Sequence, residues 1–155
     1  MIGLLQRVSA ASVDVDGQRI AEIGTGLLVL IGVERGDARP QADRLLERLL
    51  NYRVFGDARG HMNESLRDIG GDLLLVPQFT LPADTRRGNR PGFSTAASPE
   101  LGRELFEYVT GRADRLHATV ACGRFGAEMR VALVNEGPVT FWLQVAPTRQ
   151  IAAND

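Results

Sequence analysis

The chain has 155 residues, of which 44% are hydrophobic and 24% charged, with a formal net charge of −1 at pH 7. This composition is typical of one globular domain with a sizeable core, and no apolar run approaches the ~18 residues of a membrane span. All 18 basic residues are arginine, which excludes lysine Schiff-base chemistry and a lysine-containing phosphate loop. The single cysteine, Cys122, excludes a disulfide framework and a multi-cysteine zinc site. We expect no metal and no cofactor.

We expect a cytoplasmic protein without membrane contact. Residues 1–7 lack a basic segment before an apolar stretch, so no secretory signal is expected. The net charge gives no overall attraction to nucleic acid, so such a contact would need a local basic patch.

Strand patterns dominate the first part of the chain. Residues 2–8 and 12–15 carry alternating apolar positions, and Asp16-Gly17 predicts a hairpin turn before residues 19–23. The continuous apolar run at 27–33 predicts a buried central strand.

Two helices are predicted. Pro40 opens the first, over residues 41–51, and Ser98-Pro99 opens the second, which Gly111 can close. One face of the first helix is a leucine stripe, formed by Leu45, Leu46, Leu49 and Leu50.

The middle of the chain holds a strand with a polar end. Residues 54–55 predict a short strand and residues 56–63 a turn or loop; residues 72–81 then predict an apolar strand that ends in Gln78-Phe79-Thr80. Pro77 cannot donate to a ladder, so we expect pairing to be interrupted there, at an edge or a bulge. Polar groups at the end of a buried strand favour a site, although a strand running into its loop is an equal alternative.

A Pro/Gly/Arg-rich loop follows at residues 82–97, long enough to suggest a function. Its arginines Arg86, Arg87 and Arg90 are candidates for phosphate contacts, with a solvated charged loop as the alternative. His61 lacks a second ligand-type residue at metal-site spacing, and His117 is expected on the polar phase of its strand.

The last part predicts strands at 116–121, 129–134 and 139–145, with a turn at Gly137-Pro138 between the final two. We therefore predict an α+β fold, a single domain at residues 1–147, and a frayed tail at 148–155.

Two motifs together resemble the D-aminoacyl-tRNA deacylase (D-tyrosyl-tRNA deacylase) family. The first is Pro77-Gln78-Phe79-Thr80-Leu81, where the family usually has Ser-Gln-x-Thr; the second is Asn135-Glu136-Gly137-Pro138-Val139-Thr140, where it has Asn-Asp-Gly-Pro-Val-Thr. The resemblance covers nearly the whole chain, including Gln6-Arg7-Val8 and residues 125–129.

The resemblance implies a homodimer with its active site at the subunit interface, which hydrolyses the ester of D-aminoacyl-tRNA and of mischarged glycyl-tRNA. It implies a mostly antiparallel, barrel-like sheet with two packed helices. Gly137-Pro138 would be a cis pair whose carbonyls enter the partner's pocket and reject L-amino acids by a backbone clash.

Candidate roles follow for the matching residues. Gln78 and Thr80 are catalytic candidates, with Thr80 either a nucleophile or a positioning group; we favour positioning, with the ribose 2′-hydroxyl helping to activate water. The N–H groups of Phe79 and Thr80 are candidate oxyanion donors. Phe79, Phe125 and Met129 are substrate-binding candidates, and core packing is an equal alternative for the two aromatic rings.

Two positions depart from the family pattern. Pro77 replaces the family serine and removes a hydroxyl and an N–H donor, whereas Glu136 in place of aspartate keeps the charge. The alternative function is thus a catalytically weakened RNA-binding homodimer, and a third possibility is a plain homo-oligomer with Gly137-Pro138 at its interface.

Overall fold

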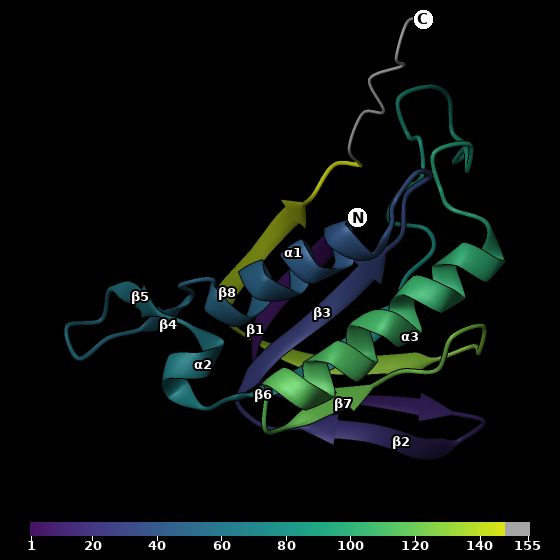
Figure 1. Ribbon diagram of the computed structural model, residues 1–155. Helices are drawn as coiled ribbons and strands as arrows, with labels where there is room; N and C mark the ends of the chain where they lie inside the picture. The colour runs from purple at the N-terminus through teal and green to yellow at the C-terminus, as the bar shows by residue number, and fades with distance from the viewer. Residues whose placement is uncertain (148–155) are drawn as a thin grey trace, which may run out of the picture.

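The computed structural model describes residues 1–147, so the predicted tail at 148–155 lies outside the described residues. Its elements in chain order are β1 (Ile2–Val15), β2 (Gln18–Ile23), β3 (Gly26–Gly32), α1 (Arg39–Asn51), β4 (Phe55–Gly56), β5 (Met62–Glu64), α2 (Leu66–Ile69), β6 (Asp72–Pro77), α3 (Pro99–Leu116), β7 (Val120–Cys122) and β8 (Arg130–Gln144) (Figure 1).

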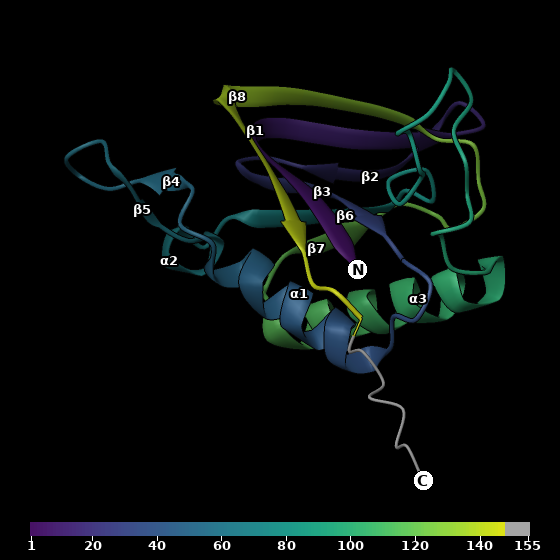
Figure 2. The ribbon, with the colours of Figure 1, turned by 90° about the horizontal axis from the view of Figure 1, so that it is seen from above.

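The main sheet has the strand order β2-β1-β3-β6-β7, and β8 pairs with β1. β1 is antiparallel to β2, β3 and β8, while β6 is parallel to β3 and β7. The sheet curls into the predicted barrel-like form, with α1 and α3 side by side along one face (Figure 2). The parallel pairs arise because a helix lies in each connection between those strands.

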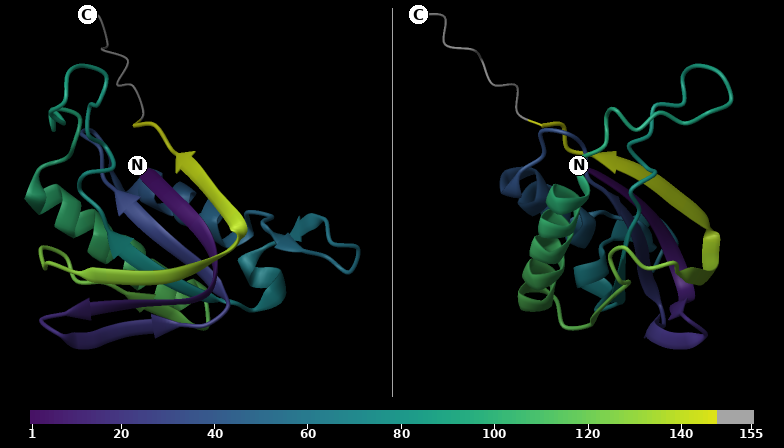
Figure 3. Two further views of the ribbon diagram at one scale, coloured as in Figure 1. Left: turned by 180° about the vertical axis from the view of Figure 1, so that it is seen from behind. Right: turned by 90° about the vertical axis from the view of Figure 1, so that its right-hand side faces the viewer.

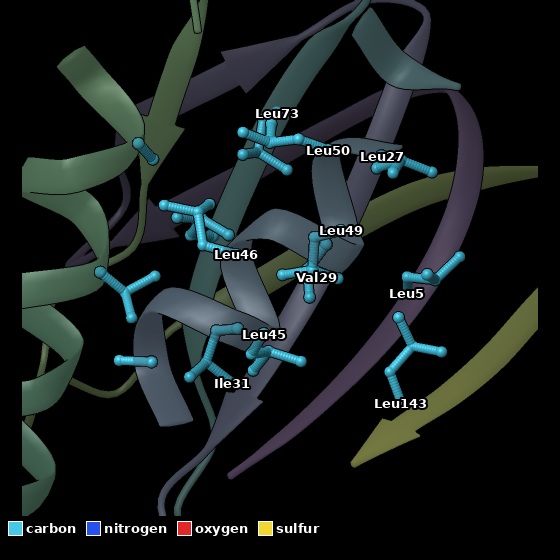
Figure 4. Close-up of a cluster of buried hydrophobic side chains, with 14 of the residues drawn as sticks. Leu5, Leu27, Val29, Ile31, Leu45, Leu46, Leu49, Leu50, Leu73 and Leu143 are labelled. Atoms are coloured by element: carbon cyan, nitrogen blue, oxygen red, sulfur yellow. The ribbon is translucent and has the colours of Figure 1, made fainter. Parts of the chain in front are cut away.

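Alternation along the strands builds two cores. Val29 and Ile31 of β3 face the helices, whereas Leu28 joins a second cluster inside the curled sheet with Leu74 and Val76 of β6. The predicted leucine stripe of α1 lies over β1, β3 and β6 in the first cluster (Figure 4). A strand buried on both faces needs a continuous apolar run, which explains the pattern at 27–33.

Several predicted boundaries are confirmed. Asp16 and Gly17 both have positive φ, 51° and 74°, as the tightest hairpin turns require. α1 spans the expected segment with Pro40 in its first turn, and Ser98 caps α3 by accepting a hydrogen bond from the Leu101 N–H.

Other boundaries were wrong. Residues 1–147 hold, besides the two predicted helices, the short α2, whose N-terminus Ser65 caps. α3 continues past Gly111 to Leu116, with Ala113 buried against the core, so the strand predicted at 116–121 shrinks to β7. The loop predicted at 56–63 is flanked by the paired strands β4 and β5, a hairpin that projects from the body in Figure 1.

The turn predicted at Gly137-Pro138 was also wrong. β8 is one strand that pairs with β1 on both sides of this point, from Gln144 opposite Ile2 to Arg130 opposite Asp14. The register shifts where β8 bends, so the extra residues loop out of the ladder. The segment is a bulge at a sharp corner of one strand and joins no hairpin (Figure 2).

Candidate active site

The polar end of β6 is the first part of the site. Pairing with β7 stops at Leu75 and β6 itself ends at Pro77, so the proline stands where no ladder donor is needed. The Gln78 N–H donates to the Ile31 carbonyl at 2.8 Å, and the chain then turns as the Leu81 N–H donates to the Gln78 carbonyl at 3.3 Å.

The turn brings two predicted catalytic side chains together. Gln78 Nε2 donates to Thr80 Oγ1 at 2.6 Å. No hydrogen bond within residues 1–147 uses the backbone N–H of Phe79 or Thr80, and both residues are exposed. Two unused N–H donors beside a hydroxyl can stabilise a developing oxyanion.

A largely apolar cavity of about 390 Å³ opens beside this turn. It is lined by Ile31, Val33, Pro77, Gln78, Phe79, Ala96, Ala97, Ser98, Pro99, Gly102, Phe106, Phe125, Gly126, Ala127 and Met129. The structure thus gathers four predicted site residues, Gln78, Phe79, Phe125 and Met129, with Thr80 just outside the lining.

No sequence pattern predicted the wall made by the start of α3. Gly102 is its key residue, since a Cβ there would lie 3.3 Å from the Phe125 ring. Phe125 also lies under the Arg103 guanidinium, 4.9 Å from the ring centroid, and 6.4 Å from Phe106. The Ser98-Pro99 signal marked the start of this helix, but nothing local indicated what its first turn would face.

Gly123 permits close packing on the opposite wall. A Cβ there would lie 2.8 Å from Met129 Sδ and 3.3 Å from Pro77 Cδ. Pro77, the departure from the family motif, therefore forms part of an apolar wall together with Met129.

Gly137-Pro138 does not line the cavity of its own chain. Its peptide bond is cis, as the resemblance implied, and both residues are exposed. The β8 corner that carries it lies across the sheet from the loop at 82–97 (Figures 1 and 2).

Three side-chain contacts fix this segment. Arg7 donates from Nε to the Glu136 carbonyl at 2.9 Å and from Nη1 to the Val54 carbonyl at 2.7 Å. Asn135 Oδ1 accepts from the Val139 N–H at 2.7 Å, so the bulge is held from both sides. A Cβ on Gly137 would lie 3.0 Å from Arg7 Nη2, at a φ of 135° that favours glycine.

The three loop arginines are not equivalent. Arg86 pairs with Asp84 through Nη2–Oδ2 at 2.7 Å and Nε–Oδ1 at 2.8 Å, and these bonds hold the pKa of Asp84 far below its ordinary value. Arg87 and Arg90 are exposed and form no ion pair with any described residue. The loop projects from the body in the right-hand view of Figure 3.

The histidines lie away from the cavity. His61 is exposed in the β4–β5 connection. His117 caps the C-terminus of α3 through its backbone N–H, which donates to the Ala113 carbonyl at 2.9 Å, and its ring Nε2 lies 2.6 Å from the Gly71 carbonyl oxygen. Within residues 1–147, no three His, Cys, Asp or Glu side chains gather closely enough to hold a metal ion. None of the described helices is long and apolar enough to cross a membrane.

Comparisons with known proteins agree with the two motifs. A D-aminoacyl-tRNA deacylase of Nitrosococcus oceani is 58% identical over 155 residues, which is all of both chains. One of Pseudomonas putida is 63% identical over 145 residues, 94% of this chain and 100% of its own. A solved structure described as the c-Myc DNA unwinding element binding protein has a TM-score of 0.90 and 34% identity, over 94% of this chain and 99% of its own.

The sequence profile described as D-Tyr-tRNA(Tyr) deacylase matches residues 4–144. That range takes in the end of β6, the cavity walls and the β8 corner. This chain belongs to the D-Tyr-tRNA(Tyr) deacylase family.

Proposed function

We propose that this protein hydrolyses the ester that joins a D-amino acid, or mischarged glycine, to the 3′ end of tRNA. The observation that carries the proposal is the apolar cavity beside the turn at Gln78 and Thr80, where unused N–H donors meet a hydroxyl. An ester substrate needs a pocket for its terminal nucleoside next to donors for its oxyanion. The family and its named relatives support the same activity.

The cavity takes the terminal adenosine. Its lining of Phe79, Phe125 and Met129 suits a flat base, and its volume of about 390 Å³ is within the range of small-ligand sites. Phe125 is held between Arg103 and Phe106, so its ring is fixed before a base arrives.

The reaction proceeds without a covalent intermediate on the protein. No histidine or carboxylate among the described residues hydrogen-bonds Thr80, so its hydroxyl lacks a base to make it a nucleophile. Because Thr80 Oγ1 accepts from Gln78, its own hydrogen remains available to the substrate. The ribose 2′-hydroxyl of the substrate helps to activate water, and the N–H groups of Phe79 and Thr80 stabilise the oxyanion.

A second copy of the chain supplies chiral selection. The Gly137-Pro138 segment is exposed, is held by hydrogen bonds and lies outside the cavity of its own chain. An element that acts on a partner chain needs all three properties. The carbonyls of the segment enter the partner's site and block the side-chain direction of an L-amino acid. Val134 and Trp142 on the free edge of β8 are 57% and 51% exposed, and they form part of the dimer surface.

Pro77 leaves this chemistry in place. The proposed donors belong to Phe79 and Thr80, beyond the proline, so the missing N–H at position 77 removes neither of them. A catalytically silent RNA-binding dimer is therefore not favoured. The cytoplasm, where tRNA is charged and used, is the proposed location.

The test is ester loss from D-tyrosyl-, L-tyrosyl- and glycyl-tRNA with the purified protein. We expect cleavage of the D-aminoacyl and glycyl esters only, with affinity that falls as salt rises because Arg87 and Arg90 contact phosphates, together with Arg86 where its pair with Asp84 opens. Binding without cleavage would identify the silent RNA-binding dimer. A protein that neither binds nor cleaves would be the plain homo-oligomer.

A further inference from the structure

An exposed aromatic pair lies outside the cavity mouth. Phe79 and Phe93 lie against each other in a tilted arrangement, with ring centroids 5.4 Å apart and planes inclined by 37°. Phe79 is 67% exposed and Phe93 is 43% exposed, and Phe79 also lines the cavity. The two rings therefore continue the cavity wall outward to the foot of the arginine loop.

The backbone that carries Phe93 is well anchored. Asp84 and Gly92 exchange N–H to carbonyl bonds of 2.7 and 2.9 Å, which close the loop just before Phe93. After Phe93, the Thr95 carbonyl accepts from the Arg35 N–H at 2.9 Å, and the Thr95 hydroxyl donates to the Pro82 carbonyl. Phe93 is thus presented on a fixed frame, which lowers the cost of ordering it on binding.

The charge beside the pair is positive and unneutralised. Arg87 and Arg90 lie on the segment closed by Asp84 and Gly92, and neither forms an ion pair with any described residue. Exposed aromatic faces beside free arginines are the combination that binds unpaired nucleotides, because every base has a π face and every phosphate a negative charge.

We propose that Phe79 and Phe93 form a stacking platform for the nucleotide next to the terminal adenosine, with its phosphate near Arg87 and Arg90. The inference rests on the proposed function, since it places the terminal base in the cavity behind Phe79. The next base of the unpaired end then emerges over the aromatic pair. Stacking of this kind is tolerant of base identity, so the platform recognises an unpaired strand and not a sequence.

The test compares one D-aminoacyl ester on three carriers: adenosine, the trinucleotide CCA, and CCA with an abasic penultimate position. A stacked base contributes roughly a fivefold factor at the low end of its range and more than about a hundredfold at the high end. We expect Phe93→Ala to lower the ratio of kcat/KM between the CCA and adenosine esters about tenfold. Phe93→Tyr should restore that ratio, because it keeps the aromatic face.

The abasic carrier isolates the contact. With the wild-type protein, kcat/KM for the abasic ester should be lower than for the CCA ester by the same factor of about ten. Phe93→Ala should not lower kcat/KM for the abasic ester any further. Leu116→Ala is the matched control, since Leu116 is also 43% exposed but lies at the far end of α3. Light scattering on each variant checks the oligomeric state.

Three outcomes would overturn the platform. They are an equal loss on both esters, an unchanged ratio, and a change of oligomeric state that accounts for the loss. A second readout separates this result from failure of the proposed function: a fluorescent cytosine analogue at the penultimate position of uncharged CCA. Its quenching by the wild-type protein but not by Phe93→Ala would support the platform even if no ester is cleaved, and equal quenching would contradict it.

Discussion

The Gln78 amide and the Thr80 hydroxyl form a directional pair. Because Gln78 Nε2 donates at 2.6 Å, a lone pair of Thr80 Oγ1 is occupied and the hydroxyl hydrogen must point elsewhere. A side chain oriented in this way positions a substrate oxygen more readily than it attacks a carbonyl carbon. The distinction leads to a direct test at Thr80.

Thr80→Ala should lower kcat/KM on D-tyrosyl-tRNA about tenfold, the effect of one lost hydrogen bond, because the backbone donors remain. Thr80→Ser keeps the hydroxyl and should recover most of the activity. The measurement is single-turnover ester loss alongside tRNA affinity. Complete loss of turnover in Thr80→Ala, with binding intact, would show that Thr80 does more than position the substrate.

The motif residues 78–80 and 135–140 were recognisable in the sequence because together they match two motifs of one family. Gly102 was not, since a glycine inside a helix carries no mark of what its surface faces. The contact between Gly102 and Phe125 joins residues 23 positions apart through the tertiary packing of α3 on residues 123–127. The family motifs therefore pointed to the candidate reacting end, whereas no local pattern indicated the α3 wall of the cavity.

At the scale of elements, β8 shows why the predicted hairpin was wrong. Alternation on both sides of Gly137-Pro138 was read correctly, yet alternation says only that strands flank the segment. Its pairing partner β1 is more than a hundred residues away, so no local signal distinguishes a reversal from a bulge. The predicted end of α3 was wrong for a similar reason. Gly111 can end a helix, but Ala113 is buried against the core, so the helix continues to Leu116.

Arg7 ties the β8 corner to the connection before β4, through the carbonyls of Glu136 and Val54. Arg7→Ala removes both charge-assisted bonds, so we expect a loss of about 2 kcal/mol in stability. The freed segment should also discriminate about tenfold less between D- and L-tyrosyl-tRNA. The ratio of kcat/KM for the two esters measures this, and Arg19→Ala, in an exposed pair on β2, is the control. Unchanged discrimination between the two esters would show that Arg7 plays no part in chiral selection.

The β4–β5 hairpin depends on one carboxylate. Asp57 accepts from Asn63 Nδ2 and from the N–H groups of His61 and Arg59, and these bonds lower its pKa from 3.8. A lowered pKa in the fold gives stabilisation that is present above the unfolded pKa and lost as pH falls through the folded one. We expect the NMR shift of the Asn63 side-chain amide, which donates to Asp57, to hold on acidification until the pH is below that ordinary value and then to move. Asp57→Asn should abolish the transition, and a hairpin that opens near neutral pH would refute this account.

At the scale of the whole molecule, the first and last described strands meet at a buried charge cluster. The Met1 ammonium group donates to Asp37 Oδ1 at 2.7 Å, Glu34 Oε2 at 2.8 Å and the Val145 carbonyl at 2.6 Å. The side chains of Met1 and Asp37 have no exposed surface, and burial raises the pKa of Asp37. This cluster joins β1, the β3–α1 connection and the end of β8.

Asp37→Ala leaves the buried ammonium group short of a partner, so it should lower the free energy of unfolding by about 3 kcal/mol. Urea denaturation measures the loss. Asp14→Ala, which breaks an exposed pair with Arg19, should have a much smaller effect and serves as the control. Equal effects of the two substitutions would show that burial of the cluster adds nothing.

The corner of β8 also bears on how this protein can evolve. Most selective loops can drift, because a substitution in them leaves the scaffold unchanged. Here the segment proposed to reject L-amino acids interrupts a strand whose two halves both pair with β1. A lineage that relaxed the segment to widen its substrate range would shift the register of the sheet's edge at the same time. A substitution that weakens this segment should therefore disturb both the proposed chiral selection and the pairing of β8 with β1.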